Sequence, residues 1–216
     1  MSEAMLFGMM LGDGWISKNL RTINGYTYWV IHGGFSGDSE SLEVVKQDLI
    51  SIFGDIGKAE ITTSKTNSPK YSIEGITSKM AVNKKVCEAF IEMGMPIGKR
   101  VETEFLLPDW IVNGSVDVKR EFISGFYAAE GYTPAMQIND KTLKPLAFKF
   151  HKRAYLKENL EALNEQFMKI LKDIGIEATI KTKIVFTCDE NIQTEFRFSN
   201  SEEQILHQFN TLNLRY

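Results

Sequence analysis

Two nine-residue stretches of the chain share one pattern: LFGMMLGDG, from Leu6 to Gly14, and ISGFYAAEG, from Ile123 to Gly131. Each stretch is mainly apolar, has small residues four positions apart, and ends in an acidic residue followed by glycine. Small residues at i and i+4 lie on one face of a helix and let two helix backbones approach closely. The repeat therefore predicts two helices that pack against each other and bring Asp13 and Glu130 to the same junction.

A carboxylate at the end of an apolar helix is poorly solvated, and the partial negative charge of the helix C-terminus adds to the cost. A divalent cation between the two acids, with glycine carbonyls nearby, would offset both effects. Ligation by oxygen alone favours Mg²⁺ over zinc. Taken singly, LFGMMLGDG is a weak signal, because Asp-Gly after an apolar helix more often marks a turn or the end of the helix than a catalytic site, but the second copy favours a paired site.

Composition fits an ordinary folded protein, with 43% hydrophobic and 25% charged residues among 216. The sequence has no apolar run of membrane-spanning length and no signal-peptide core at its start. Cys87 and Cys188 are the only cysteines, which argues against a zinc site or a disulfide framework. We expect an intracellular protein, in the cytoplasm of a prokaryote or in an organelle or nucleus of a eukaryotic host.

The order of elements after each motif is the same. In the first half the pattern predicts strands within 15–36 around the turn Asn24-Gly25, a helix from the cap Asp38 to Gly54, strands at 58–65 and 70–78, and a helix at 80–93. In the second half it predicts a helix at 118–131, strands near 132–141 and at 145–153, a helix at 155–175, strands at 177–186 and 194–199, and a helix at 199–212. The fold class is therefore α+β, with two αββαββα halves at 1–97 and 118–216, related by a pseudo-twofold axis and joined by a connector at 98–117.

Charge is divided between the elements. The strand segments 15–36, 56–79, 132–153 and 176–199 carry +2, +2, +4 and −1, while the remainder of the chain carries −10. Alternation in the strands places Lys149, His151 and Arg153 on the face opposite Phe148 and Phe150. One face of each sheet is thus predicted to pack on helices and the other to meet an anionic partner. The alternative is a solvated, lysine-rich sheet face.

The doubled motif and the repeated αββαββα order resemble the LAGLIDADG homing endonucleases, in the form with two motifs on one chain. The resemblance implies a monomer in which each half lays a four-stranded, saddle-shaped antiparallel sheet along the major groove of double-stranded DNA. By position, Asp13 and Glu130 match the metal-binding acids, and Gly12 and Ala129 match carbonyl ligands, for roughly two or three shared Mg²⁺ ions. The implied reaction is site-specific hydrolysis of one phosphodiester per strand, leaving short 3′ overhangs, in intron homing.

The family commonly has a basic residue near each scissile phosphate. PIGKRVETEFLLP resembles the stretch before the second motif, which makes Lys99 the candidate, with Arg215 as its C-terminal counterpart. The alternative is that Lys99 and Arg100 only solvate a linker. A glutamine common in the family at the end of the second strand is replaced here by FSGDS, at 35–39.

The candidate DNA-binding residues are the basic and polar side chains of the predicted strands. They are Lys18, Arg21, Tyr28, His32, Lys65, Lys70, Lys149, His151, Arg153, Lys181, Lys183 and Arg197. Residues 1–117 carry −4 and residues 118–216 carry +1, so we expect a long asymmetric target that the second half grips more strongly.

Two other classes of function remain open. An RNA-splicing maturase that binds intron RNA, or a non-cleaving DNA-binding regulator, could share this fold, although retention of both acids favours the enzyme. An α/β scaffold without nucleic acid would leave the charge segregation unexplained. The ends of the sequence lack splicing residues, which favours a freestanding enzyme over an intein insert.

Overall fold

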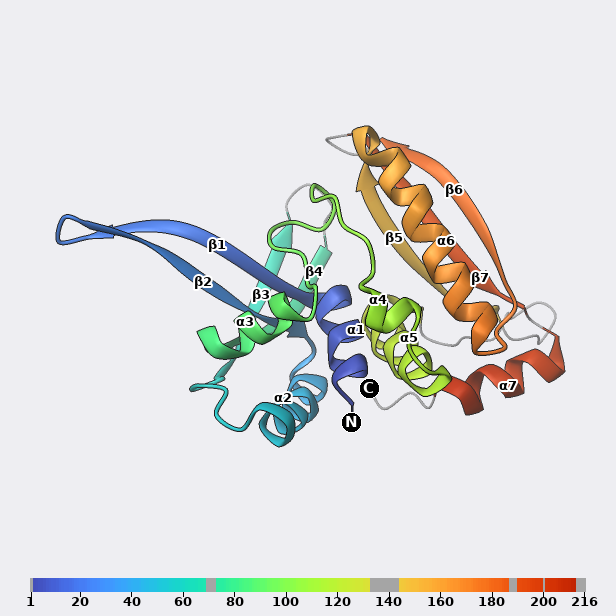
Figure 1. Cartoon of the computed structure of the whole chain (residues 1–216), viewed down its shortest axis with the longest axis horizontal. Helices are drawn as coiled ribbons and strands as arrows, with labels where there is room; N and C mark the ends of the chain where they lie inside the picture. Colours follow the sequence, from blue (N-terminus) through green and yellow to red (C-terminus); the bar gives the residue numbers. More distant parts are fainter. Residues whose placement is uncertain (1, 69–72, 133–143, 187–189, 200, 213–216) are drawn as a thin grey trace.

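The computed structural model describes residues 2–68, 73–132, 144–186, 190–199 and 201–212 (Figure 1). The first half contains α1 (Glu3–Asp13), β1 (Gly14–Ile23), β2 (Tyr26–Gly37), α2 (Ser39–Phe53), β3 (Ile61–Ser68), β4 (Ile73–Val82) and α3 (Lys84–Glu92). After the short helix α4 (Asp109–Val112), the second half contains α5 (Val116–Glu130), β5 (Ala147–Arg153), the 3₁₀ turn η1 (Ala154–Leu156), α6 (Lys157–Asp173), β6 (Ala178–Phe186), β7 (Glu190–Phe198) and α7 (Glu202–Leu212). The α+β class with two related halves is confirmed.

The motif helices α1 and α5 lie side by side at the centre of the molecule, between the two halves (Figure 1). A Cβ atom on Gly8 would overlap the carbonyl oxygen of Phe122 and lie 2.7 Å from the backbone nitrogen of Phe126. A Cβ atom on Gly125 would overlap the carbonyl oxygen of Met5. The two backbones are therefore in direct contact, because neither glycine has a side chain to hold them apart.

The first sheet is antiparallel, with strand order β1-β2-β4-β3. Because β4 pairs with β2 only over 33–37, most of β1 and β2 extends beyond the sheet as a two-stranded ribbon (Figure 1). Asn24 and Gly25 turn this ribbon with φ of 52° and 82°. Positive φ at both central residues is what a two-residue hairpin of the predicted Asn-Gly type requires.

The second sheet has three described strands in the order β5-β7-β6, all antiparallel. At its open edge, Gly131 forms a bridge with Phe148, and the Tyr132 backbone nitrogen donates to the carbonyl of Ala147 at 2.8 Å. The strand predicted near 132–141 lies almost wholly outside the described residues, so a fourth strand in this sheet stays a prediction.

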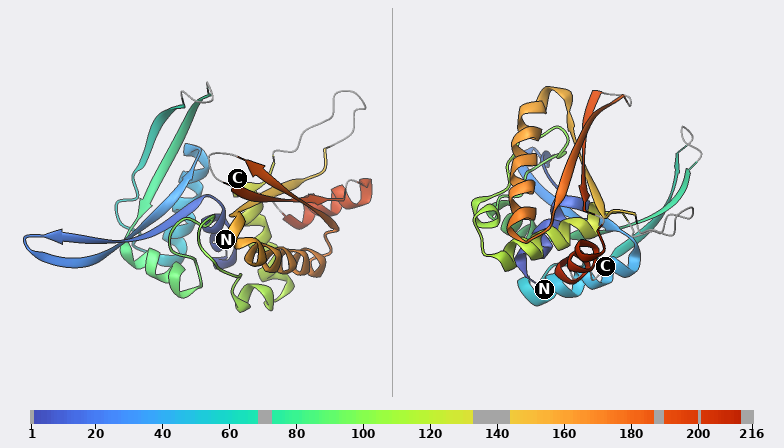
Figure 2. Two further views of the ribbon diagram at one scale, coloured as in Figure 1. Left: turned by 90° about the horizontal axis from the view of Figure 1, so that it is seen from above. Right: turned by 90° about the vertical axis from the view of Figure 1, so that its right-hand side faces the viewer.

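Helices cover one face of each sheet, and the two sheets flank the central pair (Figure 2). In the first half, Phe35 of β2 packs against Phe90 of α3, with ring centroids 6.2 Å apart. In the second half, the ring of Phe167 on α6 lies 5.5 Å from those of both Phe148 and Phe196. These apolar layers fix which face of each strand is turned away from the helices.

Several predicted boundaries differ from the structure, and two of them concern the starts of α3 and α5. The helix expected from Met80 begins only at Lys84, because Met80 and Val82 belong to β4 and pair with β2. Asn83 then caps α3 by accepting from the Val86 backbone nitrogen at 3.0 Å. The second motif helix begins at Val116, inside the expected connector, with the Ser115 hydroxyl as its cap.

The helix contact can be tested by adding a single methyl group. Gly8→Ala and Gly125→Ala are each expected to lower the free energy of unfolding by about 1–3 kcal/mol, the usual cost of overpacking a core. Gly37→Ala is the matched control, because the nearest atom to its added Cβ is Leu42 Cγ at 4.0 Å. Denaturant unfolding of the three variants measures the difference, and an equal stability for all three would contradict the close approach.

Candidate functional site

The two motif acids meet where the central helices end. A Cβ atom on Gly12 would overlap that of Ala129 and lie 3.4 Å from Cγ of Glu130. Asp13 and Glu130 are the last residues of their helices. The glycine after each acid has extended backbone and passes so close to the last turn of its own helix that a side chain would not fit. The structure therefore brings together the four residues that the motif pattern singled out.

Burial dominates the electrostatics of the pair. Burial raises the pKa of Glu130 to about 7, an effect that Arg100 opposes and the nearby Asp13 carboxylate reinforces. Desolvation by the surrounding protein also raises the pKa of Asp13 to about 6, again opposed by Arg100, although Asp13 is more exposed to solvent than Glu130. Each carboxyl group thus resists ionisation, as expected where two acids share a site with too little positive charge.

Arg100 supplies the counter-charge. Its Nη1 atom lies 3.5 Å from Oε1 of Glu130, and its pKa is lowered by burial and raised by Glu130 and Asp13. One guanidinium faces two carboxylates, so this cluster has room for a further positive charge. The candidate Lys99, by contrast, is 75% exposed, with Nζ 3.3 Å from Glu102. Sequence reasoning missed Arg100 because nothing in the pair Lys99-Arg100 indicates which side chain turns inward.

A cavity of ≈ 460 Å³, which is within the size range of ligand sites, opens beside Glu130 between the two halves. It is lined by Gly14–Ser17 of β1, Gly98–Val101 of the connector, Glu130, and Lys149–His151 of β5. Lys99 and Arg100 both line it, whereas Arg215 lies outside the described residues. The polar groups of both halves therefore converge on one opening.

The second sheet presents its cations on the face away from α6, as predicted. The pairing register places Lys149 beside Glu195 and Glu195 beside Lys181, and it places Gln193 between His151 and Lys183. The remaining predicted residues of this face, Arg153 and Arg197, follow from the same alternation. Charge counting alone missed Glu195 and Gln193, which the register places in the middle of the face.

Several of these side chains already have partners. Arg197 Nε lies 2.8 Å from Oε1 of Glu195, and Gln193 Nε2 lies 2.6 Å from Nε2 of His151. Arg153 Nη2 lies 2.7 Å from Oε1 of Glu102, so its guanidinium binds the connector. The face is therefore an ordered polar surface rather than a set of independent lysines.

In the first half, Lys18 and Lys65 lie on the opposite face of the sheet from the other described candidates. Lys18 shares the face of the buried Ile16 and places its ammonium 5.2 Å from the centre of the Trp29 ring. Lys65 shares the face of Ile61, which pairs with the buried Met80. Both were chosen by charge, but a strand alternates its faces at every residue.

The opposite face of the first sheet carries the other candidates. Arg21 pairs with Tyr28, and His32 pairs with Ser17, whose hydroxyl lies 2.9 Å from the imidazole Nε2. The register adds Lys79, which is exposed and pairs with Thr62 on this face. Lys70 lies outside the described residues.

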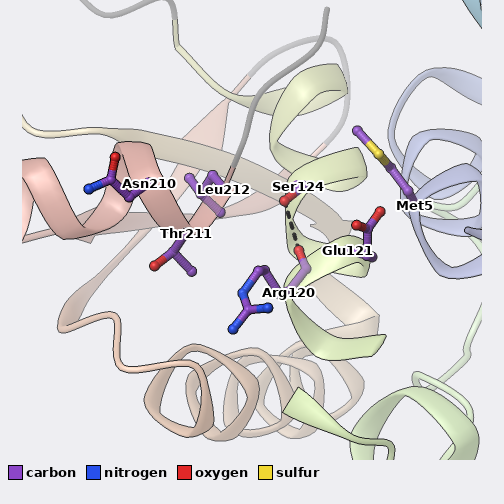
Figure 3. A pocket seen from close by; sticks show the side chains of 7 residues that line it. All are labelled: Met5, Arg120, Glu121, Ser124, Asn210, Thr211 and Leu212. Carbon is purple, nitrogen blue, oxygen red and sulfur yellow. Dashed lines mark hydrogen bonds between the residues drawn. The ribbon is translucent and has the colours of Figure 1, made fainter. Parts of the chain in front are cut away.

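A second cavity, of ≈ 360 Å³, lies between α5 and α7 and is also bordered by Met5 of α1 (Figure 3). Its charged groups are engaged elsewhere: Arg120 Nη1 lies 2.6 Å from Asp117, and Glu121 accepts from the Ser2 hydroxyl at 3.4 Å. The Ser124 hydroxyl donates to the Arg120 carbonyl at 2.8 Å (Figure 3). Arg120, Glu121 and Ser124 all lie at least one full turn of α5 before Glu130, its last residue, so this cavity is separate from the acid pair.

Within the described ranges, no three His, Cys, Asp or Glu side chains form a group that could hold a metal ion unaided. None of the described helices combines the length and apolar character that crossing a membrane requires. A metal at the acid pair would therefore need oxygen ligands beyond the side chains of Asp13 and Glu130.

No family model matches the chain. The tRNA-splicing ligase RtcB of Methanopyrus kandleri is 29% identical over an alignment of 184 residues that covers 82% of this chain and 17% of the ligase. RNA polymerase subunit Rpo1N of Methanocaldococcus jannaschii is 27% identical, over 83% of this chain and 13% of that subunit. The replication factor C small subunit of the same organism is 26% identical, over 82% of this chain and 9% of its own length. The chain thus spans less than a fifth of each of these relatives.

Solved structures give a different likeness. The LAGLIDADG homing endonuclease I-GzeII, in complex with its DNA target, matches with a TM-score of 0.57 and 10% identity over 100% of this chain and 85% of that one. The LAGLIDADG homing endonuclease I-SmaMI, bound to cleaved DNA, matches with a TM-score of 0.52 and 12% identity over 99% of this chain and 84% of that one. Likeness at this identity establishes architecture rather than activity. The chain has the two-domain fold of the LAGLIDADG homing endonucleases.

Proposed function

We propose that the chain is a homing endonuclease that cuts double-stranded DNA at a specific site, hydrolysing one phosphodiester per strand with Mg²⁺ and leaving short 3′ overhangs. The observation that carries this proposal is the meeting of Asp13 and Glu130 at the ends of two helices in backbone contact. The sheets on either side of this junction turn basic faces away from their helices. A central pair of acids between two cationic surfaces suits a duplex cut once on each strand.

The relatives with similar sequences support the view that this chain is a separate module that occurs in several proteins, and not a part of the ligase machinery. A tRNA-splicing ligase, an RNA polymerase subunit and a replication factor subunit have different functions, yet each matches over 82–83% of this chain. The matched parts of the chain must therefore overlap, and they cannot owe their sequence to any one of those activities. In each relative they form only a small part of a longer protein. A self-contained segment found inside unrelated proteins fits a mobile genetic element and extends the proposal beyond a freestanding enzyme.

The acid pair fits Mg²⁺. This ion is usually bound by one or two carboxylates together with phosphates of the substrate, and it keeps several waters. Asp13 and Glu130 would supply the carboxylates, with the carbonyls of Gly12 and Ala129 beside them. The raised pKa of both acids indicates a site short of positive charge, which a bound cation would correct. Two carboxylates, without a third acidic ligand among the described residues, are therefore compatible with the proposal.

The chain's own groups then have distinct roles. Bound Mg²⁺ would stabilise charge on the phosphate oxygens and activate water. Asp13 and Glu130 hold negative charge at the junction, one from each half, and so face the two strands of a duplex. Arg100, which contacts Glu130, is placed to bind a phosphate oxygen and to stabilise the negative charge that develops there. The sheet faces bind the flanking DNA and set its register by contacts to phosphates and base edges.

Removing either motif charge should stop cleavage without stopping binding. Plasmids carrying a randomised library, incubated with Mg²⁺, identify the cut site. Asp13→Asn and Glu130→Gln are then expected to slow cleavage by roughly 10²-fold or more, the scale for loss of one electrostatic group at a reaction centre. Asp173→Asn is the control, because Asp173 lies at the end of α6 and pairs with Lys119 of α5, and this variant should cleave normally. A wild-type protein that binds a site and never cuts it would indicate a regulator or a maturase instead.

The raised pKa values of Asp13 and Glu130 predict that the stability of the metal-free protein depends on pH. The folded state keeps protons on Asp13 and Glu130 up to about pH 6 and 7, whereas the unfolded chain releases them near its ordinary pKa, about pH 4. Between these values the folded state binds more protons, so these groups make stability fall as pH rises through this window. In EDTA, the double variant Asp13→Asn/Glu130→Gln should therefore melt higher than wild type at about pH 8 and equally near pH 4.

Added Mg²⁺ should raise the melting temperature of wild type but not that of the double variant, because the ion binds only the folded state. Equal melting of both proteins at every pH would show that the acids are not confined together.

The basic face should control the salt dependence of binding. Lys183→Ala is expected to weaken binding to all DNA sequences and to reduce the slope of log K against log salt by about 1, since each phosphate contact releases one condensed counterion. Lys65→Ala, on the helix-side face of the first sheet, should leave the slope unchanged. Fluorescence anisotropy over a salt series measures both, and equal slopes for the two variants would reject the face assignment.

A further inference from the structure

Lys152 is a charged residue at a position where the alternation of β5 predicts a buried apolar side chain. It follows Phe148 and Phe150 on the helix-side face of β5, and its side chain has no exposed surface. A buried ammonium is costly unless it is fully hydrogen-bonded. Its neighbours in the strand, Lys149 and Arg153, lie on the opposite face, so neither the DNA-facing surface nor the hydrophobic layer explains this lysine.

The partners of Lys152 all belong to the connector or to its own strand. Its Nζ donates to the carbonyl oxygen of Arg100 at 2.9 Å and to that of Thr103. The same ammonium lies 4.0 Å from the centre of the Phe105 ring and 5.8 Å from that of Phe150. Charge-assisted hydrogen bonds and cation–π contacts are the interactions that can offset burial.

The connector is held to β5 and η1 at neighbouring points too. The Arg153 backbone nitrogen donates to the carbonyl of Val101 at 2.9 Å, and the Tyr155 hydroxyl donates to the carbonyl of Glu102 at 3.4 Å. The hydrogen bond from Lys152 Nζ joins β5 to the main-chain carbonyl of Arg100 itself. The side chain of Arg100 extends from that fixed backbone to Glu130.

We propose that Lys152 is a positioning residue, which fixes the backbone of Arg100 and thereby holds its guanidinium between Asp13 and Glu130. The effect on cleavage rests on the proposed function, whereas the placement of Arg100 does not. Lys152 would never touch DNA, since it lies on the helix side of the sheet. A lysine suits this task because its ammonium has three donors and can bind two carbonyls while the stem packs among phenylalanines.

The test replaces Lys152 by Met, which keeps the apolar stem and removes the donors. Lys152→Met is expected to slow cleavage at saturating DNA by about 10–100-fold, as for loss of other groups that orient a metal site, with the dissociation constant for DNA unchanged. Lys119→Met is the matched control, because Lys119 is also buried and bound through Nζ, at 2.7 Å from Asp173. It should lose stability but cleave at the wild-type rate. Equal cleavage rates for the two lysine variants would overturn the proposal.

A double-mutant cycle separates positioning from general destabilisation. If Lys152 acts through Arg100, the double variant Lys152→Met/Arg100→Met should cleave no more slowly than Arg100→Met alone. Effects that multiply in the double variant would mean that Lys152 acts by another route, and the proposal would fail.

A titration keeps the inference testable if no DNA is cleaved. In metal-free protein, the carboxyl ¹³C signal of Glu130 should titrate at higher pH in Lys152→Met and in Arg100→Met than in wild type, because both changes remove the guanidinium from the carboxylate. Lys119→Met should leave that titration unchanged. Absence of cleavage by wild type would reject the proposed function alone, whereas an unaltered Glu130 titration in Lys152→Met would reject the positioning role alone.

Discussion

The backbone contact between α1 and α5 is the constraint from which the rest of the arrangement follows. Gly8 and Gly125 meet the main chain of the opposite helix, so the separation of the two axes is set by backbone atoms rather than by adaptable side chains. Because each helix ends at its acid, the same contact brings Asp13 and Glu130 together. Strand β1 begins at Gly14, directly after Asp13, so the helix contact also determines where the first sheet leaves the junction. One helix pair thus positions both the acids and a surface beside them.

That arrangement confines negative charge where solvation is poor. Raised pKa values at Asp13 and Glu130 report the cost, and Arg100 offsets only part of it. A helix junction that existed only for stability would not need two acids so close together. Under the proposed function, a bound cation accounts for the two acids, and the basic sheet faces suit a polyanionic partner. Cation and polyanion can then bind together, each reducing the electrostatic cost of the other.

Local signals in the sequence predicted a large part of this fold. The doubled motif predicted the helix pair, Asn24-Gly25 predicted the hairpin, and Asp38 predicted the start of α2. Met80 was assigned to a helix because a short apolar run does not distinguish a strand from a helix, and only pairing with β2 decides it. Lys18 and Lys65 were assigned by charge, but the face of a strand residue depends on register. Register is set by partners far along the chain.

The site residues that sequence reasoning missed depend on tertiary contacts of the connector. Arg100 and Lys99 are adjacent and chemically alike, and the choice between them is made by β5, which binds the main chain of 100–103. A signal was nevertheless present in β5. The run Phe148, Phe150, Lys152 breaks an apolar alternation with a charge, and such a break costs free energy unless a specific partner lies opposite. A lysine on the apolar face of a strand is thus evidence for a polar contact with another segment, here the connector that carries the central arginine.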